Sequence, residues 1–260
     1  MKTPVMIERT RSRLSLARAH YRKSEVPKIS FPIATYNRQE ILVNRTIPSI
    51  LDQSYRNIEI VIVGDCVSPD AELYISRSFE GENRVRFFNL RSRTAYPIDP
   101  FSFWCVAGYR PRNIASRLSR GELLWWISDD DEVVPGAVQR FVEHLPRVPP
   151  EAEVYSGDML YRGDIIDLQK ATIDHGLSAQ VTGIPSLVVR RYISQLFRFN
   201  GKSFENKINR PCDYDLYSRM IDFDIKFSYL PIVLSKINLS LPDKGLHGSQ
   251  AYINHSEAFR

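Results

Sequence analysis

Residues 58–65 read Ile-Glu-Ile-Val-Ile-Val-Gly-Asp, and they decide the fold class. A run dominated by Ile and Val predicts a strand that is covered on both faces, as strands in parallel sheets are, and this run stops at Gly64-Asp65. Two similar apolar runs lie on either side of it in the chain. Residues 29–34 end in the polar segment 35–38, and residues 123–127 end in a serine followed by three aspartates.

Helical patterns separate these strands. We expect helices at 39–53, kinked by Pro48, at 69–79, at 106–118, ended by Gly121, and from Pro135 onward, with a further strand at 85–90 and a loop at 91–105. This alternation predicts an α/β fold, an open and mostly parallel sheet flanked by helices, with its ligand beyond the carboxyl ends of the strands. The half after residue 151 is less regular, with strands expected at 154–160 and 181–189 and a helix at 214–221.

One domain accounts for most of the chain, because 260 residues with 43% hydrophobic content bury a core of single-domain size. We expect a basic arm at residues 1–27, the α/β domain at 28–235 and a tail at 236–260. The sequence shows neither a membrane-spanning apolar run nor a secretory leader, which predicts a cytoplasmic protein. The three cysteines suit neither a zinc site nor a disulfide framework, so we expect them to be reduced.

The positive charge is concentrated at the beginning of the chain. Residues 1–28 hold eight Lys or Arg against two acids, which leaves the remainder close to neutral although the whole chain carries +5. No nucleic-acid partner is expected, because such a binder carries its basic surface on the folded domain, mixed with aromatic side chains. Two interpretations of the arm stay open: a solvated helix packed on its own domain, or peripheral contact with an anionic membrane surface at the inner membrane face.

Three adjacent carboxylates, Asp129, Asp130 and Asp131, follow the apolar run at 123–127. Like charges at this spacing repel and raise one another's pKa, so a positive partner is expected. A divalent cation such as Mg or Mn takes carboxylate oxygens together with the phosphate oxygens of a substrate. The alternative is an acidic start to the helix near Pro135, where aspartates cap the helix and complement its dipole.

Several short motifs occur in an order that is typical of one family. They are Thr35-Tyr36-Asn37-Arg38, Pro-Ser-Ile-Leu-Asp-Gln-Ser-Tyr at 48–55, Glu-Ile-Val-Ile-Val-Gly-Asp at 59–65, Arg112-Asn113, Gly121-Glu122, the aspartates with Pro135, and Pro211-Cys212-Asp213-Tyr214-Asp215-Leu216 with Arg219. Together they resemble family 2 glycosyltransferases of the GT-A fold over residues 29–230. The sequence departs from the family at Gly64, Ser128 and Cys212, where many relatives have an acid, and these departures bear on the metal geometry.

The resemblance implies a Rossmann-like half that binds a nucleotide diphosphate sugar, and a second, less regular half that binds the acceptor. It implies that Tyr36 lies near the base, that Asp65 accepts a hydrogen bond from a uracil-type ring, and that Asp129 faces the ribose or a nearby phosphate. It assigns the Mn or Mg ion to Asp130, helped by Asp131. The nucleotide-binding set that it implies is Thr35, Tyr36, Arg38, Asp65, Arg112 and Asp129. Arg91 or Arg93 is a candidate for a second positive contact with the diphosphate, and a surface ion pair is the open alternative for either.

The late acidic motif implies a catalytic base, Asp213. A diphosphate leaving group needs no protonation, so an inverting transfer requires one carboxylate that takes the acceptor proton, in contrast to glycoside hydrolysis. Asp215 is expected to orient or support it. The alternative for Asp213 is an N-cap role, because a helical pattern follows it directly. A nucleophilic role for Cys212 is disfavoured, since no histidine lies nearby in the sequence.

These features predict a metal-dependent, inverting glycosyltransferase that moves a sugar from a nucleotide diphosphate sugar, with UDP-sugars as the first candidates, to a hydroxyl of a glycan or lipid-linked precursor. Two alternatives stay open. A sugar nucleotidyltransferase is disfavoured because residues 35–38 lack the glycines of a phosphate loop, and a non-catalytic nucleotide-sugar-binding protein would keep the fold without turnover. Trp104 is a candidate acceptor contact, at least one of Trp125 and Trp126 is expected in the core, and His247 is a candidate metal ligand or a surface residue.

Overall fold

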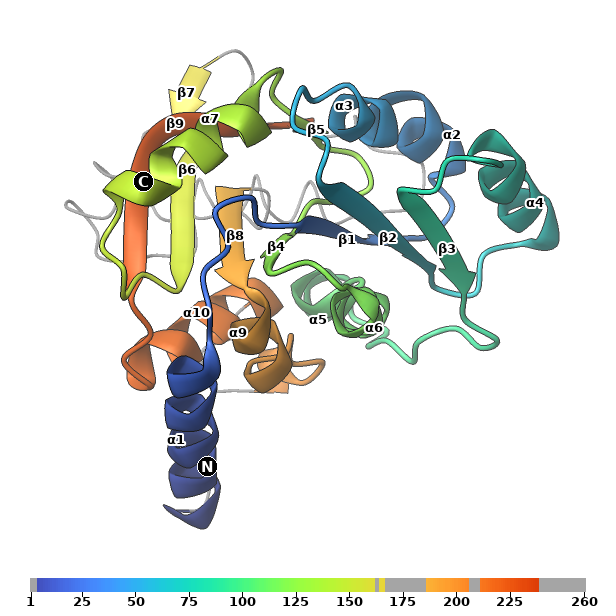
Figure 1. Ribbon diagram of the computed structural model, residues 1–260. Coiled ribbons are helices and arrows are strands. Elements are labelled where there is room, and N and C mark those ends of the chain that lie inside the picture. Colours follow the sequence, from blue (N-terminus) through green and yellow to red (C-terminus); the bar gives the residue numbers. More distant parts are fainter. Residues whose placement is uncertain (1–3, 162–163, 167–185, 206–210, 239–260) are drawn as a thin grey trace.

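The computed structural model describes residues 4–161, 164–166, 186–205 and 211–238, and within these ranges nine strands form one sheet (Figure 1). The strand order is β3-β2-β1-β4-β8-β6-β9-β5, with β7 paired to β6. The bounds are β1 Ile29–Thr35, β2 Ile58–Gly64, β3 Val85–Asn89, β4 Leu123–Trp125, β5 Glu132–Val133, β6 Val154–Tyr161, β7 Asp164–Ile166, β8 Leu187–Arg190 and β9 Phe227–Ile237.

The first four strands of this order are mutually parallel, whereas β8 runs antiparallel to both of its neighbours, β4 and β6. Strand β9 is parallel to β6, and β5 is antiparallel to β9. The predicted α/β class is confirmed, and its regular parallel part lies in the first half of the chain. The less regular second half adds the antiparallel pairings.

Helices cover both faces of the parallel part (Figure 1). On one face Ile47 and Phe141 pack in the same core as Phe31, and on the other face Ala115 packs against Val61. The helices are α1 Pro4–His20, α2 Gln39–Ile41, α3 Ile47–Leu51, α4 Pro69–Ser78, α5 Pro100–Val106, α6 Tyr109–Leu118, α7 Ala137–His144, α9 Arg191–Leu196 and α10 Cys212–Asp222, with a π-helix at Leu42–Thr46 and 3₁₀ turns at Leu145–Arg147 and Ser203–Glu205. Every residue of β1 and β2 is buried as a result, which explains why their sequences are mostly apolar.

The helix expected at 39–53 is present as α2, the π-helix and α3 in succession, and the π-helix ends just before Pro48. The loop expected at 91–105 is wrong in its last part, where α5 forms. The Asp99 carboxylate accepts the Ser102 N–H at 2.7 Å and caps this helix, and Pro100 occupies its first turn. The helix expected from residue 106 begins instead at Tyr109, because Gly108 interrupts it at a φ of 73°.

The role predicted for Gly121, ending a helix, is wrong. Helix α6 already ends at Leu118, and Gly121 lies against β1 instead. A Cβ atom at this position would stand 2.5 Å from Ser30 Oγ and 2.7 Å from the carbonyl oxygen of Lys28. The missing side chain therefore lets the start of β4 approach β1, and the Gly121 N–H donates to Ser30 Oγ at 2.8 Å.

The segment after the three aspartates also differs from expectation. Instead of starting a helix near Pro135, the chain forms β5 and then Gly136, with a φ of 71°, before α7 begins at Ala137. The interpretation of the aspartates as an acidic helix start is therefore wrong, because a strand and a turn separate them from α7.

In the second half, the strand expected at 154–160 is confirmed as β6, and the helix expected at 214–221 is confirmed as α10. Of the strand expected at 181–189, residues from 186 onward are described and enter β8. Residues 181–185 and His247 lie outside the described residues.

The basic arm forms α1 and packs on its own domain, as the first of the two interpretations expected. Leu14 is 2% exposed and belongs to the core under the second half of the sheet, while Arg9, Arg11 and Arg13 are exposed. In the part of the chain that the structure covers, no helix has the length and apolar content to cross a bilayer. Contact of the arm with an anionic membrane surface stays a prediction.

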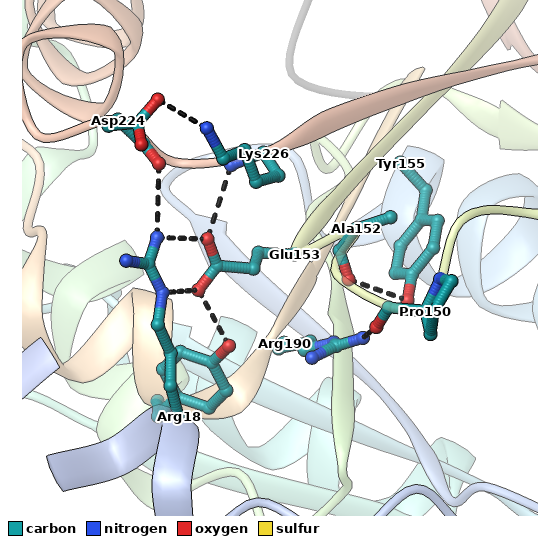
Figure 2. Close-up of polar contacts among 9 residues, drawn as sticks. Arg18, Pro150, Ala152, Glu153, Tyr155, Arg190, Asp224 and Lys226 are labelled. Carbon is teal, nitrogen blue, oxygen red and sulfur yellow. Dashed lines mark hydrogen bonds and ion pairs between the residues drawn. The ribbon is translucent and has the colours of Figure 1, made fainter. Parts of the chain in front are cut away.

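A buried carboxylate ties α1 to the sheet (Figure 2). Glu153, which is 1% exposed, accepts two hydrogen bonds from the Arg18 guanidinium, at 2.9 and 2.5 Å. The Tyr192 hydroxyl donates to the same carboxylate at 2.7 Å, and the Lys226 backbone N–H donates at 3.1 Å. Arg18 also donates to the Asp224 carbonyl at 3.0 Å. One charged group thus joins α1, α9, β6 and the turn before β9.

We predict that Glu153→Gln lowers the free energy of unfolding by about 1 to 3 kcal/mol, because the amide cannot satisfy four donors and leaves buried groups without an acceptor. Urea denaturation at neutral pH measures the effect. Glu151→Gln, two residues away on the exposed surface, is the matched control and should change stability by less than about 0.5 kcal/mol. Equal midpoints for the two variants would contradict a stabilising role for this network.

Candidate functional site

Polar residues converge at the carboxyl edge of the parallel strands. Strand β1 ends at the buried Thr35, and Asn37 then adopts a left-handed φ of 54°, which turns the chain sharply at the end of the strand. Arg38, at the start of the following helix, pairs with two carboxylates from the end of β4. Its Nη1 lies 3.4 Å from Asp129 Oδ1 and also forms an ion pair with Asp130 Oδ2.

The acidic run is buried rather than solvated. Asp129 is 8% exposed and Asp131 is 4% exposed. Burial and the neighbouring charge of Asp130 raise the pKa of Asp129 to about 6, although Arg38 opposes the shift. Burial also raises the pKa of Asp131 well above its ordinary value, and the charge of Asp130 adds to this effect, while the Asn238 N–H, 3.1 Å from Asp131 Oδ1, opposes it. The repulsion between neighbouring carboxylates that the sequence predicted is present, and Arg38 and the Asn238 N–H offset it only in part.

The π-helix supplies two contacts that the sequence analysis missed. Arg45 Nη2 donates to the backbone oxygen of Asp130 at 2.5 Å, and Thr46 Oγ1 donates to that of Asp129 at 2.9 Å. Arg45 lies seven residues after Arg38, so two helical turns place both side chains toward the acidic run. The spacing of the two arginines was visible in the sequence, but the backbone oxygen of Asp130 as the partner of Arg45 was not.

The Asp65 carboxylate is hydrogen-bonded within the protein, whereas the sequence predicted that it contacts the nucleotide base. Asp65 is 2% exposed, and its carboxylate accepts the Thr94 N–H at 3.0 Å, the Thr94 hydroxyl at 2.6 Å and the Tyr96 hydroxyl at 2.7 Å. It therefore fastens the segment after β3 to the end of β2. The same segment carries Arg93, whose guanidinium carbon lies 3.1 Å from the ring centroid of Tyr36. Thr94 and Tyr96 had no recognisable sequence signal, because they lie in a stretch without periodic pattern.

A second group of predicted residues gathers around Arg112 and Asp213. Arg112 is 8% exposed, and its charge opposes the burial that raises the pKa of Asp213. Asp213 lies in the first turn of α10, after the N-cap residue Pro211, so the N-cap alternative for Asp213 is wrong. Its Oδ1 accepts the Tyr214 N–H at 2.8 Å. Asp215 instead pairs with Arg219 at 2.7 Å, one helical turn on.

The cysteine and tryptophan candidates belong mainly to the core. Burial raises the pKa of Cys212 to about 12, which keeps its thiol protonated and agrees with the case against a nucleophile. Both Trp125 and Trp126 are fully buried, the first beside Phe31 with ring centroids 5.5 Å apart. Trp104 is half-buried on α5.

Comparisons with known proteins bear on the family and the fold. Residues 30–97 match the family described as glycosyl transferase family 2, a range that covers β1, β2, β3 and the Tyr36, Arg38 and Asp65 positions. WcaA of Escherichia coli (strain K12), a candidate colanic acid biosynthesis glycosyl transferase, is 27% identical over 199 residues, covering 75% of this chain and 66% of WcaA. These matches support a glycosyltransferase of family 2.

Solved structures of glycosyltransferases place this chain in the GT-A fold. S. aureus TarS 1-349 in complex with UDP matches with a TM-score of 0.62 at 16% identity, over 82% of this chain and 61% of that one. The mannosyltransferase PcManGT of Pyrobaculum calidifontis, in complex with GDP-Man and Mn2+, matches with a TM-score of 0.60 at 14% identity, over 98% of this chain and 71% of that one.

A second curated relative is the GalNAc(5)-diNAcBac-PP-undecaprenol beta-1,3-glucosyltransferase of Campylobacter jejuni, which is 25% identical over 118 residues. The match covers 45% of this chain and 34% of the relative. This chain therefore spans about two thirds of one curated relative and about one third of the other.

We predict that the buried Asp129 makes stability depend on pH. Its pKa is about 6 in the folded chain against an ordinary 3.8, so ionisation weakens folding as pH rises from about 4 to 6. In metal-free buffer, the parent should therefore lose about 1 to 2 kcal/mol relative to Asp129→Asn between pH 5 and 7. Urea denaturation of both proteins at each pH measures this difference. Parallel pH profiles would contradict the raised pKa.

Proposed function

We propose that this chain transfers a sugar from a nucleotide diphosphate sugar to an acceptor hydroxyl, with inversion and with the help of a divalent cation. UDP-sugars are the first donors to test. The observation that carries the proposal is the pair formed by the buried Asp129 and the half-buried Asp130 at the carboxyl edge of β4, facing Arg38 from the adjacent end of β1. Negative charge gathered beside a positive side chain, at the ligand-binding edge of a parallel sheet, suits a metal and diphosphate site.

The residues present fit a divalent cation. Among the residues that the structure describes, no set of three or more His, Cys, Asp or Glu side chains is arranged to hold a metal ion. One or two carboxylates are what a cation needs when substrate phosphates complete its coordination, and buried, mutually repelling carboxylates favour such an ion. Asp130, helped by Asp131, would hold Mn or Mg, which stabilises the negative charge that develops on the leaving diphosphate.

The protein's own side chains would bind and orient the donor. Tyr36 offers its ring near the base, with Arg93 lying over it. Asp129 is assigned to the ribose or a nearby phosphate, and Thr35, at the end of β1, is assigned to the same nucleotide-binding set. Arg38 and Arg112 supply positive charge for the diphosphate, since guanidinium groups match phosphate oxygens in a bidentate geometry. Asp65 contributes by holding the segment that carries Arg93, and its direct contact with the base stays a prediction.

Asp213 is the proposed base. It would take the proton of the acceptor hydroxyl as that oxygen attacks the anomeric carbon. Burial raises its pKa, which strengthens it as a proton acceptor, while the charge of Arg112 limits the rise. One base acting without a second nucleophilic carboxylate corresponds to inversion.

We also propose an acceptor that is a glycan or a lipid-linked precursor. The support is the name of the Campylobacter jejuni relative, which describes an acceptor carried on undecaprenol through a diphosphate. In this proposal residues 28–235 form the transferase domain, and residues 236–260 are a tail whose first two residues complete β9.

The test is a screen of nucleotide sugars for Mn-dependent release of nucleoside diphosphate. We predict that Asp130→Ala loses Mn-dependent donor binding and turnover, because the proposed cation ligand is gone. Asp213→Asn should bind the donor within about threefold of the parent and lose transfer by about 100-fold or more, the range expected for removal of a general base. Calorimetry with UDP and Mn measures binding, and coupled nucleotide detection measures turnover.

The matched control is Asp222→Asn, an exposed carboxylate at the far end of the same helix as Asp213, which should leave both measurements unchanged. If Asp213→Asn turned over as fast as the parent, the base assignment would be wrong. If every donor bound but none was turned over, the non-catalytic alternative would replace the transferase.

A further inference from the structure

Arg38 occupies the place where the proposed site needs a cation. A single guanidinium nitrogen reaches Asp129 Oδ1 at 3.4 Å and also pairs with Asp130 Oδ2, so one positive group bridges both carboxylates. All three side chains are largely buried, with 21% of Arg38, 11% of Asp129 and 15% of Asp130 exposed. Water screens such a bridge only weakly.

A divalent ion and this guanidinium compete for the same oxygens. A metal ligand oxygen lies roughly 2.0 to 2.6 Å from its ion, so an ion on Asp130 Oδ2 would stand directly beside Arg38 Nη1. Two positive charges at that separation repel each other strongly in a site that excludes water. Arg38 must therefore leave Asp130 before the ion enters.

We propose that Arg38 is a built-in counter-ion that closes the cation site until a nucleoside diphosphate binds. This inference rests on the proposed function, because it concerns the same carboxylates. The diphosphate offers Arg38 an alternative partner whose oxygens match its fork of donors. Once Arg38 has moved to the phosphates, Asp130 is available to the metal, so metal and nucleotide bind together rather than in either order.

The arrangement has a measurable signature in the coupling between the two ligands. If the nucleotide releases Arg38, it raises the affinity for metal, and by linkage the metal raises the affinity for nucleotide by the same factor. In the nucleotide-free protein, a variant without the Arg38 guanidinium has no side chain there that competes with the metal for Asp130. Metal alone should then bind more tightly, and the nucleotide should add less to that binding.

The experiment measures Mn2+ affinity by the loss of the free-ion electron paramagnetic resonance signal, with and without UDP, for the parent and for Arg38→Met. We predict that Arg38→Met binds Mn2+ alone about tenfold more tightly than the parent and that its UDP-dependent gain is reduced by a similar factor. Arg38→Gln, which is shorter and polar, provides a second variant, and circular dichroism checks that each protein is folded.

Arg45→Met is the matched control. Arg45 belongs to the same helical segment, and it donates to the backbone oxygen of Asp130. Loss of its charge should change the affinity for Mn2+ alone by less than about threefold, because this charge does not occupy the metal's place on the carboxylate. An equal gain in Arg38→Met and Arg45→Met would show a general charge effect and overturn the counter-ion role.

Two other results separate this inference from the proposed function. Weaker or unchanged Mn2+ binding in both Arg38 variants, with normal UDP-dependent Mn2+ binding in the parent, would overturn the counter-ion role and leave the transferase proposal intact. No Mn2+ binding in the parent, even with UDP or GDP present, would remove the metal from the proposed function and the counter-ion role with it.

Discussion

The site depends on the burial of several negative charges at one edge of the sheet. Asp129 and Asp131 are almost fully removed from water, and a buried carboxylate is costly unless charges or donors compensate it. The compensation comes from elements around the aspartates: Arg38 from the end of β1, Arg45 and Thr46 from the π-helix, and the Asn238 N–H from the end of β9. The local conformations of these segments are therefore tied to the charge that they surround.

Sheet topology explains how these segments meet. Strands β1 and β4 are neighbours and parallel, with Ile29 opposite Leu123, so their carboxyl ends leave the sheet at the same edge. The close approach of the two strands requires Gly121, because any side chain there would collide with Ser30. Gly121, at the amino end of β4, thus helps to bring Arg38 close to Asp129 at the carboxyl ends of the strands. The packing of the core and the geometry of the site cannot be separated.

The sequence predicted what depends on local pattern and missed what depends on distant partners. Strands β1 and β2 were predictable because both faces are covered and every residue is apolar or tightly packed. Helix α5 was missed because Pro97 and Pro100 made its surroundings look like a loop, although Asp99 is a recognisable cap. The partners of Asp65 lie 29 and 31 residues further along the chain, and no periodicity links them to it. The positions of Asp129 and Arg38 were predictable from strand ends, but their ion pair required the fold.

Buried carboxylates at the two ends of the parallel strands have opposite pKa shifts. This contrast distinguishes a carboxylate that stabilises the fold from one that is suited to binding a cation. Burial alone would raise the pKa of Glu59, but hydrogen bonds from Ser30, the Arg120 N–H and Arg86 outweigh it, and the pKa of Glu59 is lowered. Donors and a positive charge of the protein thus more than offset the burial of this carboxylate. At the carboxyl edge, burial raises the pKa of Asp129 despite Arg38, so the protein leaves part of that charge uncompensated. Groups perturbed in this way concentrate at functional sites, since the missing compensation is what a bound cation would supply.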